Sequence, residues 1–209
     1  MTDAKRHKPY AKSHFNFLYN LLFCDNIDLF KTHSAEKDVG PWSTLLAEQP
    51  DKVALHKIAN DEANEGRVRA LAFNRLRTLG EAVPPRLLLG VIVEVPVKNG
   101  LDVLAAFSEG GVRYLNHSEK AAIFEGHGNP AEGLAKELIA VSQPTINKIG
   151  PWDKDRLPPP KTNVRITFLV SDGLYFGEGP FDLLQQDEMA KPILSTANRL
   201  LQKVVECAT

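Results

Sequence analysis

The sequence has few cysteines and no apolar run long enough to span a membrane. Cys24 and Cys207 are its only cysteines, which are too few for a disulfide framework and lack the paired spacing of a zinc site. The apolar segment at residues 15–23 falls well short of the roughly 20 residues that cross a bilayer. The basic N-terminus contains no secretory-signal core. We therefore expect a soluble, cytoplasmic protein that does not enter a membrane.

The chain also lacks an excess of charge of either sign. It has 25 basic and 26 acidic residues and a formal net charge of -1, so no overall field attracts nucleic acid or anionic lipid. One interpretation is a local basic ridge on one helix, where four arginines cluster: Arg67, Arg69, Arg75 and Arg77. A solvated helix face paired with Glu62 and Glu65 is the commoner arrangement, and we favour it. Nucleic acid is therefore disfavoured as a partner.

Motifs for metal and nucleotide binding are absent as well. The six histidines are scattered, without a second ligand at the spacing of metal-binding helices or ribbons. The segments GHGNP and GEGP lack the lysine and the glycine series of a phosphate-binding loop. Cys24 has no basic neighbour in sequence and is interpreted as a packed thiol. We predict no metal and no cofactor.

What is present is a chain long enough for one sizeable core. Its 209 residues contain no internal linker that would demand two domains. Residues 1–12 are polar and basic, and an amphipathic helix follows them from Ser13, which can cap it. The predicted organisation is a tail over residues 1–12 and a single α+β domain over residues 13–209.

Residues 87–125 have the pattern of an antiparallel meander. An apolar, β-branched run leads into Asn99-Gly100, a dipeptide typical of a two-residue hairpin turn. This turn predicts Lys98 opposite Leu101 and Glu94 opposite Ala105. A four-residue loop at 108–111 then predicts Phe107 opposite Val112 and Asp102 opposite His117.

This register predicts a sheet with two apolar faces. One face carries Val91, Val93, Val95, Leu104, Ala106 and Leu115, with Asp102, His117 and Arg113 at its ends. The other carries Ile92, Val103, Ala105, Phe107, Val112 and Tyr114, interrupted by Glu94 and Asn116. Two apolar faces require cover on both sides, by helices or by another subunit. A register error of one residue would reverse the faces of a whole strand.

A second hairpin is predicted near residues 164–178, with Asp172-Gly173 at its turn and Val170 opposite Tyr175. A middle helix has Asn129 as its cap and ends with a break near Pro144, and a C-terminal helix has Asp187 as its cap. The predicted fold class is therefore α+β. It consists of an antiparallel sheet of about five or six strands covered by N-terminal, middle and C-terminal helices.

The predicted pair of Asp102 and His117 is the sharpest candidate for chemistry. A carboxylate within hydrogen-bonding reach fixes the tautomer of an imidazole and makes it a better base. Ser118 is next to His117 but is expected on the opposite strand face, where it is poorly aimed for nucleophilic attack. A polar cross-strand pair at the rim of the sheet is the structural alternative, and it is favoured.

Glu94 is the second candidate, because a carboxylate within VIVEVPV is predicted to be buried. A buried acid needs a partner, for which we consider Tyr114, Asn116, an arginine from a helix or a cationic ligand. Desolvation would raise its pKa, and perturbed acids cluster at functional sites. Glu94, Arg113, Tyr114 and Asn116 are the candidate ligand-binding residues.

The sequence leaves two functional classes open and does not decide whether the chain is an enzyme. The favoured class is a non-catalytic binding or assembly protein, forming a homo-oligomer or holding a small-molecule ligand. The alternative is a small-molecule hydrolase or transferase that uses Asp102 and His117, or Glu94 with Tyr114 and Asn116. The alternative requires these side chains to meet in one cleft.

Overall fold

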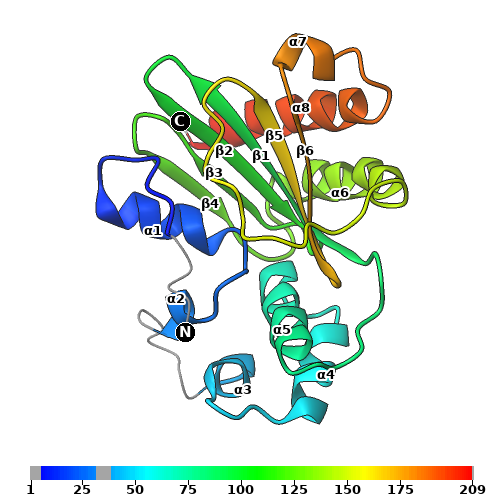
Figure 1. The fold of residues 1–209 in the computed structure, drawn as a ribbon. Helices are drawn as coiled ribbons and strands as arrows, with labels where there is room; N and C mark the ends of the chain where they lie inside the picture. The colour runs from blue at the N-terminus through cyan, green and yellow to red at the C-terminus, as the bar shows by residue number, and fades with distance from the viewer. Residues whose placement is uncertain (1–5, 32–38, 209) are drawn as a thin grey trace.

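The computed structural model describes residues 6–31 and 39–208 and contains one six-stranded antiparallel sheet (Figure 1). The strand order is β4-β3-β2-β1-β5-β6. The strands are β1 (Leu88–Val97), β2 (Gly100–Phe107), β3 (Val112–Leu115), β4 (Ala121–Phe124), β5 (Val164–Val170) and β6 (Gly173–Gly179). The meander and the second hairpin join through β1 and β5, so the predicted α+β class and antiparallel sheet are confirmed.

The described residues form eight helices around this sheet. They are α1 (Ser13–Leu21), α2 (Asp28–Lys31), α3 (Pro41–Leu46), α4 (Lys52–Asn60), α5 (Gly66–Thr78), α6 (Glu132–Ile146), α7 (Phe181–Leu184) and α8 (Ala190–Ala208). Asp51 caps α4 by accepting from the Ala54 N–H at 2.7 Å, and Asp187 caps α8 by accepting from the Ala190 N–H at 2.8 Å. The cap predicted at Asp187 is thus present. The middle helix differs, because it continues to Ile146 and contains Pro144 in its last turn.

Helices of this same chain cover both faces of the sheet. The α6/α8 face packs its β-strand residues, among them Val93, Leu104 and Phe168, against α6 and α8. The α1/α5 face packs Ile92, Val103 and Phe107 against α1 and α5. The two apolar faces expected from the sequence are therefore each closed by helices (Figure 1).

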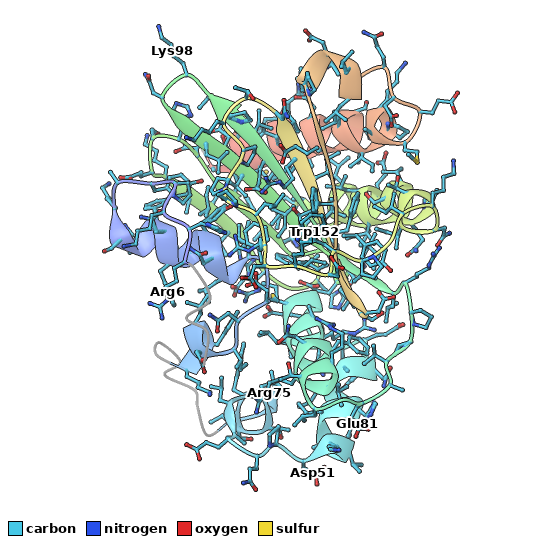
Figure 2. All side chains as sticks on the ribbon, viewed as in Figure 1. Arg6, Asp51, Arg75, Glu81, Lys98 and Trp152 are labelled. Atoms are coloured by element: carbon cyan, nitrogen blue, oxygen red, sulfur yellow. The ribbon has the colours of Figure 1, made fainter. Side chains whose placement is uncertain are left out.

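Both glycine-containing hairpins turn one residue earlier than predicted. Val97 pairs with Gly100 and Val170 with Gly173, so Lys98–Asn99 and Ser171–Asp172 form the turns. A tight turn centred on Asn-Gly would require positive φ at both of its central residues. Neither Asn99 nor Asp172 has a positive φ, and each glycine instead begins the return strand. Lys98 lies at the tip of the β1–β2 hairpin and extends away from the body of the molecule (Figure 2).

This correction moves each predicted partner by two residues and leaves the side-chain faces unchanged. Glu94 lies opposite Val103 instead of Ala105, and Val170 no longer faces Tyr175. The faces are preserved because side chains alternate along a strand with a period of two.

The register of β2 with β3 is displaced by one residue, and here the faces are reversed. Leu104 pairs with Tyr114 and Ala105 with Arg113. The loop holds three residues instead of four, because the Phe107 N–H donates to the Gly111 carbonyl at 2.9 Å. Gly110, with a φ of 105°, supplies the conformation that this tight loop needs. The α6/α8 face therefore carries Val112 and Tyr114, and the α1/α5 face carries Arg113 and Leu115.

Residues 6–10, called here the N-terminal arm, are attached to α1. Asn20 and His7 exchange two hydrogen bonds, at 3.2 and 2.7 Å. Asn16 and Tyr10 exchange another two, at 2.8 and 2.7 Å. The sequence predicts a tail as far as residue 12, whereas Tyr10 is buried in the core. Residues 1–5 of that predicted tail lie outside the described residues.

The arginines of α5 bind carbonyl groups instead of forming a solvated face. Arg69 donates to the Ala59 carbonyl at 3.0 Å, Arg75 to Ala47 at 2.6 Å, and Arg77 to the Ser171 carbonyl. Arg67 alone makes the ion pair expected from the sequence, with Glu65 at 3.1 Å. The helix therefore uses its basic residues to join α3, α4 and the β5–β6 turn.

Candidate functional site: a buried ion network beside a basic groove

Glu94 is a fully buried carboxylate on the α1/α5 face. The Tyr19 hydroxyl donates to its Oε1 at 2.7 Å, and Arg165 Nη1 lies 3.7 Å from its Oε2. Arg165 stands on β5 directly opposite Glu94, so the sheet register itself creates the pair. Burial raises the pKa of Glu94, while the Tyr19 hydrogen bond and the charge of Arg165 oppose that rise.

Arg165 also fixes the proline strap, which we define as residues 157–161. Its Nη1 donates to the Pro158 carbonyl at 2.8 Å. Its Nε and Nη2 contact Glu178 Oε2 at 2.8 and 2.6 Å. One buried guanidinium thus connects β1, β6 and the strap, with Nε and Nη2 both directed at one carboxylate oxygen of Glu178.

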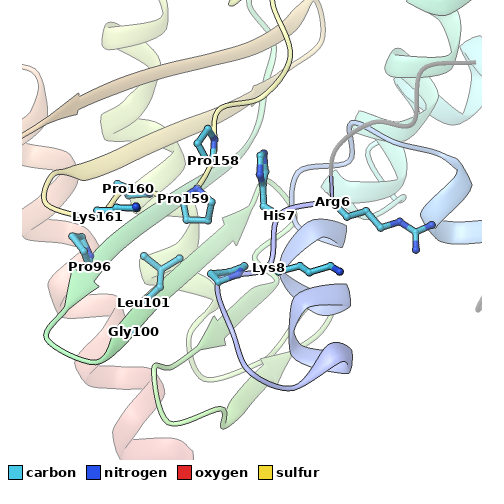
Figure 3. Close-up of a pocket in the computed structure, with 11 residues that line it drawn as sticks. Arg6, His7, Lys8, Pro96, Gly100, Leu101, Pro158, Pro159, Pro160 and Lys161 are labelled. Atoms are coloured by element: carbon cyan, nitrogen blue, oxygen red, sulfur yellow. The ribbon is translucent and has the colours of Figure 1, made fainter.

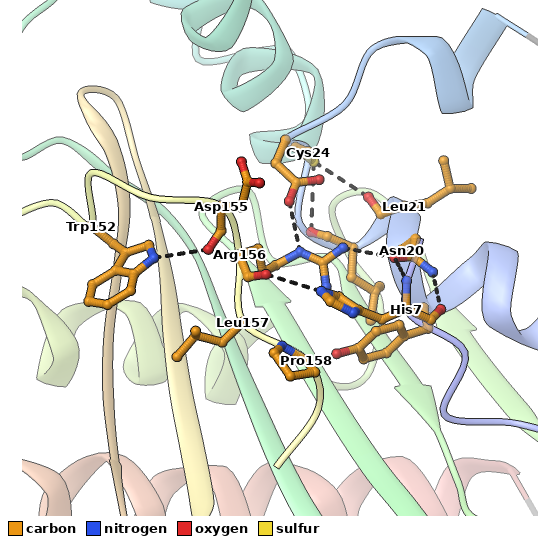
Figure 4. Close-up of polar contacts among 12 residues, drawn as sticks. His7, Asn20, Leu21, Cys24, Trp152, Asp155, Arg156, Leu157 and Pro158 are labelled. Atoms are coloured by element: carbon orange, nitrogen blue, oxygen red, sulfur yellow. Dashed lines mark hydrogen bonds and ion pairs between the residues drawn. The ribbon is translucent and has the colours of Figure 1, made fainter. Parts of the chain in front are cut away.

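A second arginine, Arg156, directly precedes the strap and connects it to α1 and to the N-terminal arm (Figure 4). Arg156 lies over the Phe23 ring at 3.9 Å and donates to Asp25 at 2.7 Å and to Asn20 at 2.8 Å. His7 Nε2 donates to the Arg156 carbonyl at 3.1 Å. Burial is the main reason that the pKa of His7 is lowered. The arm and the strap are therefore held together across the end of the sheet.

An open groove of about 1020 Å³ lies between the arm, the strap and the β1–β2 hairpin (Figure 3). Pro96 and Leu101, which pair across β1 and β2, form part of its lining, two residue pairs beyond Glu94. The full lining is Arg6, His7, Lys8, Pro9, Pro96, Gly100, Leu101, Pro158, Pro159, Pro160 and Lys161. Every ionisable side chain in this set is basic. The groove therefore combines apolar walls with a basic border.

The basic side chains occupy different parts of that border. Lys161 lies beside Pro160 and Pro96, whereas Arg6 and Lys8 extend from the opposite wall away from the strap (Figure 3). His7 stands between the two walls through its bond to the Arg156 carbonyl. Among these cations, Lys161 is therefore the one that lies beside the apolar lining (Figure 3).

A second cavity of about 540 Å³ adjoins the groove and shares Arg6, His7 and Pro158 with it. Its charges are mixed, with Asp25 and Asp172 facing the same space as Arg77 and Arg156. Its lining joins four cations, Arg6, Arg77, Lys154 and Arg156, to three acids, Asp25, Asp155 and Asp172, so its charges largely offset one another.

Asp102 and His117 do meet, at the rim of the sheet. His117 Nδ1 lies 2.8 Å from Asp102 Oδ1, and the His117 N–H donates to the same oxygen at 2.7 Å. The imidazole side chain is 47% exposed, and neither residue lines the groove or the second cavity. The Ser118 hydroxyl donates to Asn116 instead of His117. The pair therefore resembles a polar cross-strand contact at the rim of the sheet, which is the structural alternative favoured from the sequence.

The other candidate residues are not brought to Glu94. Tyr114 lies on the α6/α8 face and donates to Asp102 at 3.1 Å. Asn116 accepts from the Ser118 and Lys120 N–H groups and shapes the β3–β4 turn. Arg113 is buried and donates to the Phe124 carbonyl at 3.0 Å and to Glu125 at 2.8 Å, and burial lowers its pKa. The reversed β3 strand is the reason that Tyr114 and Glu94 are separated.

Sequence reasoning missed Tyr19 and Arg165 as the partners of Glu94. A signal for Arg165 was present, because VRITF places one cation among inward-facing residues just as VIVEV places one anion. Recognising the pair required pairing β1 with β5. Tyr19 offered no such signal, since its contact depends on how α1 crosses the sheet.

Cys24 is confirmed as a packed thiol, because it is buried and burial raises its pKa to about 12. Within residues 6–31 and 39–208, no group of three or more His, Cys, Asp or Glu residues could hold a metal ion. None of the helices in the described part of the chain is long and apolar enough to cross a membrane. Comparison with known proteins gives no matching family model and no matching curated protein.

Proposed function

We propose that this chain is a non-catalytic binding protein whose groove accepts a ligand with apolar groups and negative charge. The observation that carries the proposal is the lining of the groove, which joins Leu101 and five prolines to three cations, Arg6, Lys8 and Lys161, and to His7, and includes no acid. Apolar surface supplies most of the binding free energy in such sites, and the charged groups supply orientation and selectivity.

The construction of the walls supports this function. Prolines have a fixed φ and no N–H, so the strap offers a rigid apolar surface without unsatisfied donors. Arg165 and His7 attach the strap to the sheet and to the arm. A preformed groove loses little conformational entropy on binding.

Titration with anilinonaphthalene sulfonate, an aromatic anion, tests the proposal through the increase in its fluorescence. Lys161→Gln removes the cation nearest the apolar lining and should weaken binding about fourfold, on the basis of one ion pair at about 5 Å in water. Lys161→Glu should weaken it more than tenfold, since it converts attraction into repulsion. Lys148→Glu makes the same change at an exposed position just after α6 and is the matched control. Equal affinity of all four proteins would contradict the proposal.

Hydrolysis is a second candidate function, favoured by the 2.8 Å contact of His117 with Asp102. His117 would act as a general base toward water, since Ser118 is engaged with Asn116. Hydrolysis of p-nitrophenyl acetate by the intact protein, lost in both His117→Ala and Asp102→Asn, would support this candidate. Activity that survives in either variant would exclude it.

A cytoplasmic location is also proposed. Cys24 and Cys207 are both free, as expected in a reducing compartment. Fractionation of cells that express the chain, with a cytoplasmic and a membrane marker, tests this directly. Recovery with the membrane fraction would contradict it.

A further inference from the structure

We propose that the groove binds α7 of a second copy of this chain. This inference depends on the proposed binding function of the groove and names its partner. It joins two surface features that share no residue: the groove, and an exposed acidic turn around α7.

The second feature, called here the α7 knob, comprises residues 180–188. Phe181 is 45% exposed and Leu183 is 63% exposed. No other two exposed large apolar side chains in the described part of the chain lie so close in sequence. The neighbouring Leu184 packs into the α6/α8 core, so the knob is anchored while its two apolar side chains face outward. Exposed apolar groups that are held in place in this way are typical of contact surfaces.

The knob is also acidic. Asp182, Asp187 and Glu188 lie within it, and the sequence contains no lysine or arginine from residue 166 to residue 190. The groove has the opposite character, because its ionisable lining residues are all basic. Its volume of about 1020 Å³ reaches the upper end of ordinary binding pockets, which are about 300–1,000 Å³. Apolar groups flanked by acids on the knob thus match an apolar floor flanked by bases in the groove.

The knob does not occupy the groove of its own molecule. None of residues 180–188 lines the groove, and Leu184 anchors α7 in the α6/α8 core, whereas Leu101 belongs to the core of the α1/α5 face. The contact therefore joins different surfaces of two copies, which is a head-to-tail arrangement. Few residues take part, so the association is expected to be weak and salt-sensitive.

Sedimentation equilibrium over a wide concentration range tests this inference with three proteins. The wild type should gain mass with concentration, and added salt should reduce that gain. The knob variant Phe181→Asp/Leu183→Asp and the groove variant Lys8→Glu/Lys161→Glu should each keep the mass of one chain. All of the substituted side chains are exposed, and circular dichroism verifies that each variant is folded.

Mixing the two variants provides the decisive experiment. The knob variant retains an intact groove and the groove variant retains an intact knob, so an equimolar mixture should form a dimer that neither variant forms alone. A wild type that stays monomeric, self-association that persists in the knob variant, or a mixture that stays monomeric would each overturn the inference. If the wild type stays monomeric but still binds anilinonaphthalene sulfonate through Lys161, the proposed binding function stands and only the partner is wrong.

Discussion

The two faces of the sheet bury similar strands under helices but use different chemistry. The α6/α8 face joins apolar side chains such as Val93 and Phe168 to α6 and α8. The α1/α5 face buries Glu94 and Arg165 beside its apolar residues and ends at the open groove. Desolvating a buried ion pair costs free energy, and well-packed apolar residues often stabilise a fold equally well or better. The α6/α8 face thus packs mainly apolar side chains, whereas the α1/α5 face also supports the groove that we propose as the binding surface.

The largest effects should come from removing one central residue on each face. Phe168→Ala creates a cavity on the α6/α8 face and should cost about 3–5 kcal/mol of unfolding free energy. Arg165→Met leaves Glu94 without its cation and should also cost about 3–5 kcal/mol. Chemical denaturation at neutral pH measures both. The double variant Glu94→Gln/Arg165→Met should recover much of the second loss, because no unpaired buried charge remains.

The pH dependence of these two losses distinguishes their causes. In Arg165→Met the pKa of the buried Glu94 rises further above its value in the unfolded chain. The folded state then binds more protons, so stability decreases as pH rises above the unfolded pKa and is regained as pH falls through the folded pKa. Denaturation at several pH values should show this recovery for Arg165→Met alone. A Phe168→Ala loss with the same pH dependence would contradict the comparison.

A smaller effect is expected from removing one phenolic hydroxyl on each face. Tyr19→Phe deletes the donor to the buried Glu94 and should cost about 1.5–3 kcal/mol. Tyr175→Phe deletes the donor to Asp172, a partly exposed acid in the β5–β6 turn, and should cost less. Urea denaturation compares the two losses. A larger loss of unfolding free energy in Tyr175→Phe than in Tyr19→Phe would contradict the comparison. It would place the more stabilising hydrogen bond on the α6/α8 face.

The smallest effect concerns the walls of the groove. His7→Ala removes the bond to the Arg156 carbonyl and should cost about 0.5–1.5 kcal/mol. Hydrogen exchange should become faster in the arm and the strap while the α6/α8 face stays protected. His14→Ala, at an exposed position of α1 with no hydrogen bond from its side chain among the described residues, is the control and should leave exchange unchanged.

The layered architecture could be predicted from the sequence because it depends on local periodicity. Apolar alternation, glycine-containing turns and amphipathic helices locate the sheet and its cover without knowledge of distant contacts. The residues of the turns predicted the strand registers less well than periodicity predicted the layers. The shift at Lys98–Asn99 preserved the faces, whereas the three-residue loop closed by Gly111 reversed β3 and moved Tyr114 away from Glu94.

The site was harder to predict because it is built from segments far apart in the chain. Glu94 was recognised as a buried acid, but Arg165 reaches it from β5 and Tyr19 from α1. The contact of His117 with Asp102 was anticipated, although the register that suggested it was wrong. The groove had no local signature, since its walls come from the arm, the β1–β2 hairpin and the strap.

Titration of the ¹⁵N-labelled protein with anilinonaphthalene sulfonate, followed by amide NMR, tests the central claim most directly. We predict that the largest shift changes fall on the arm, on Gly100 and Leu101 and on Lys161, while the α6/α8 face stays unchanged. Changes concentrated on α6 and α8, or no saturable change at all, would contradict the assignment of the groove as the binding surface.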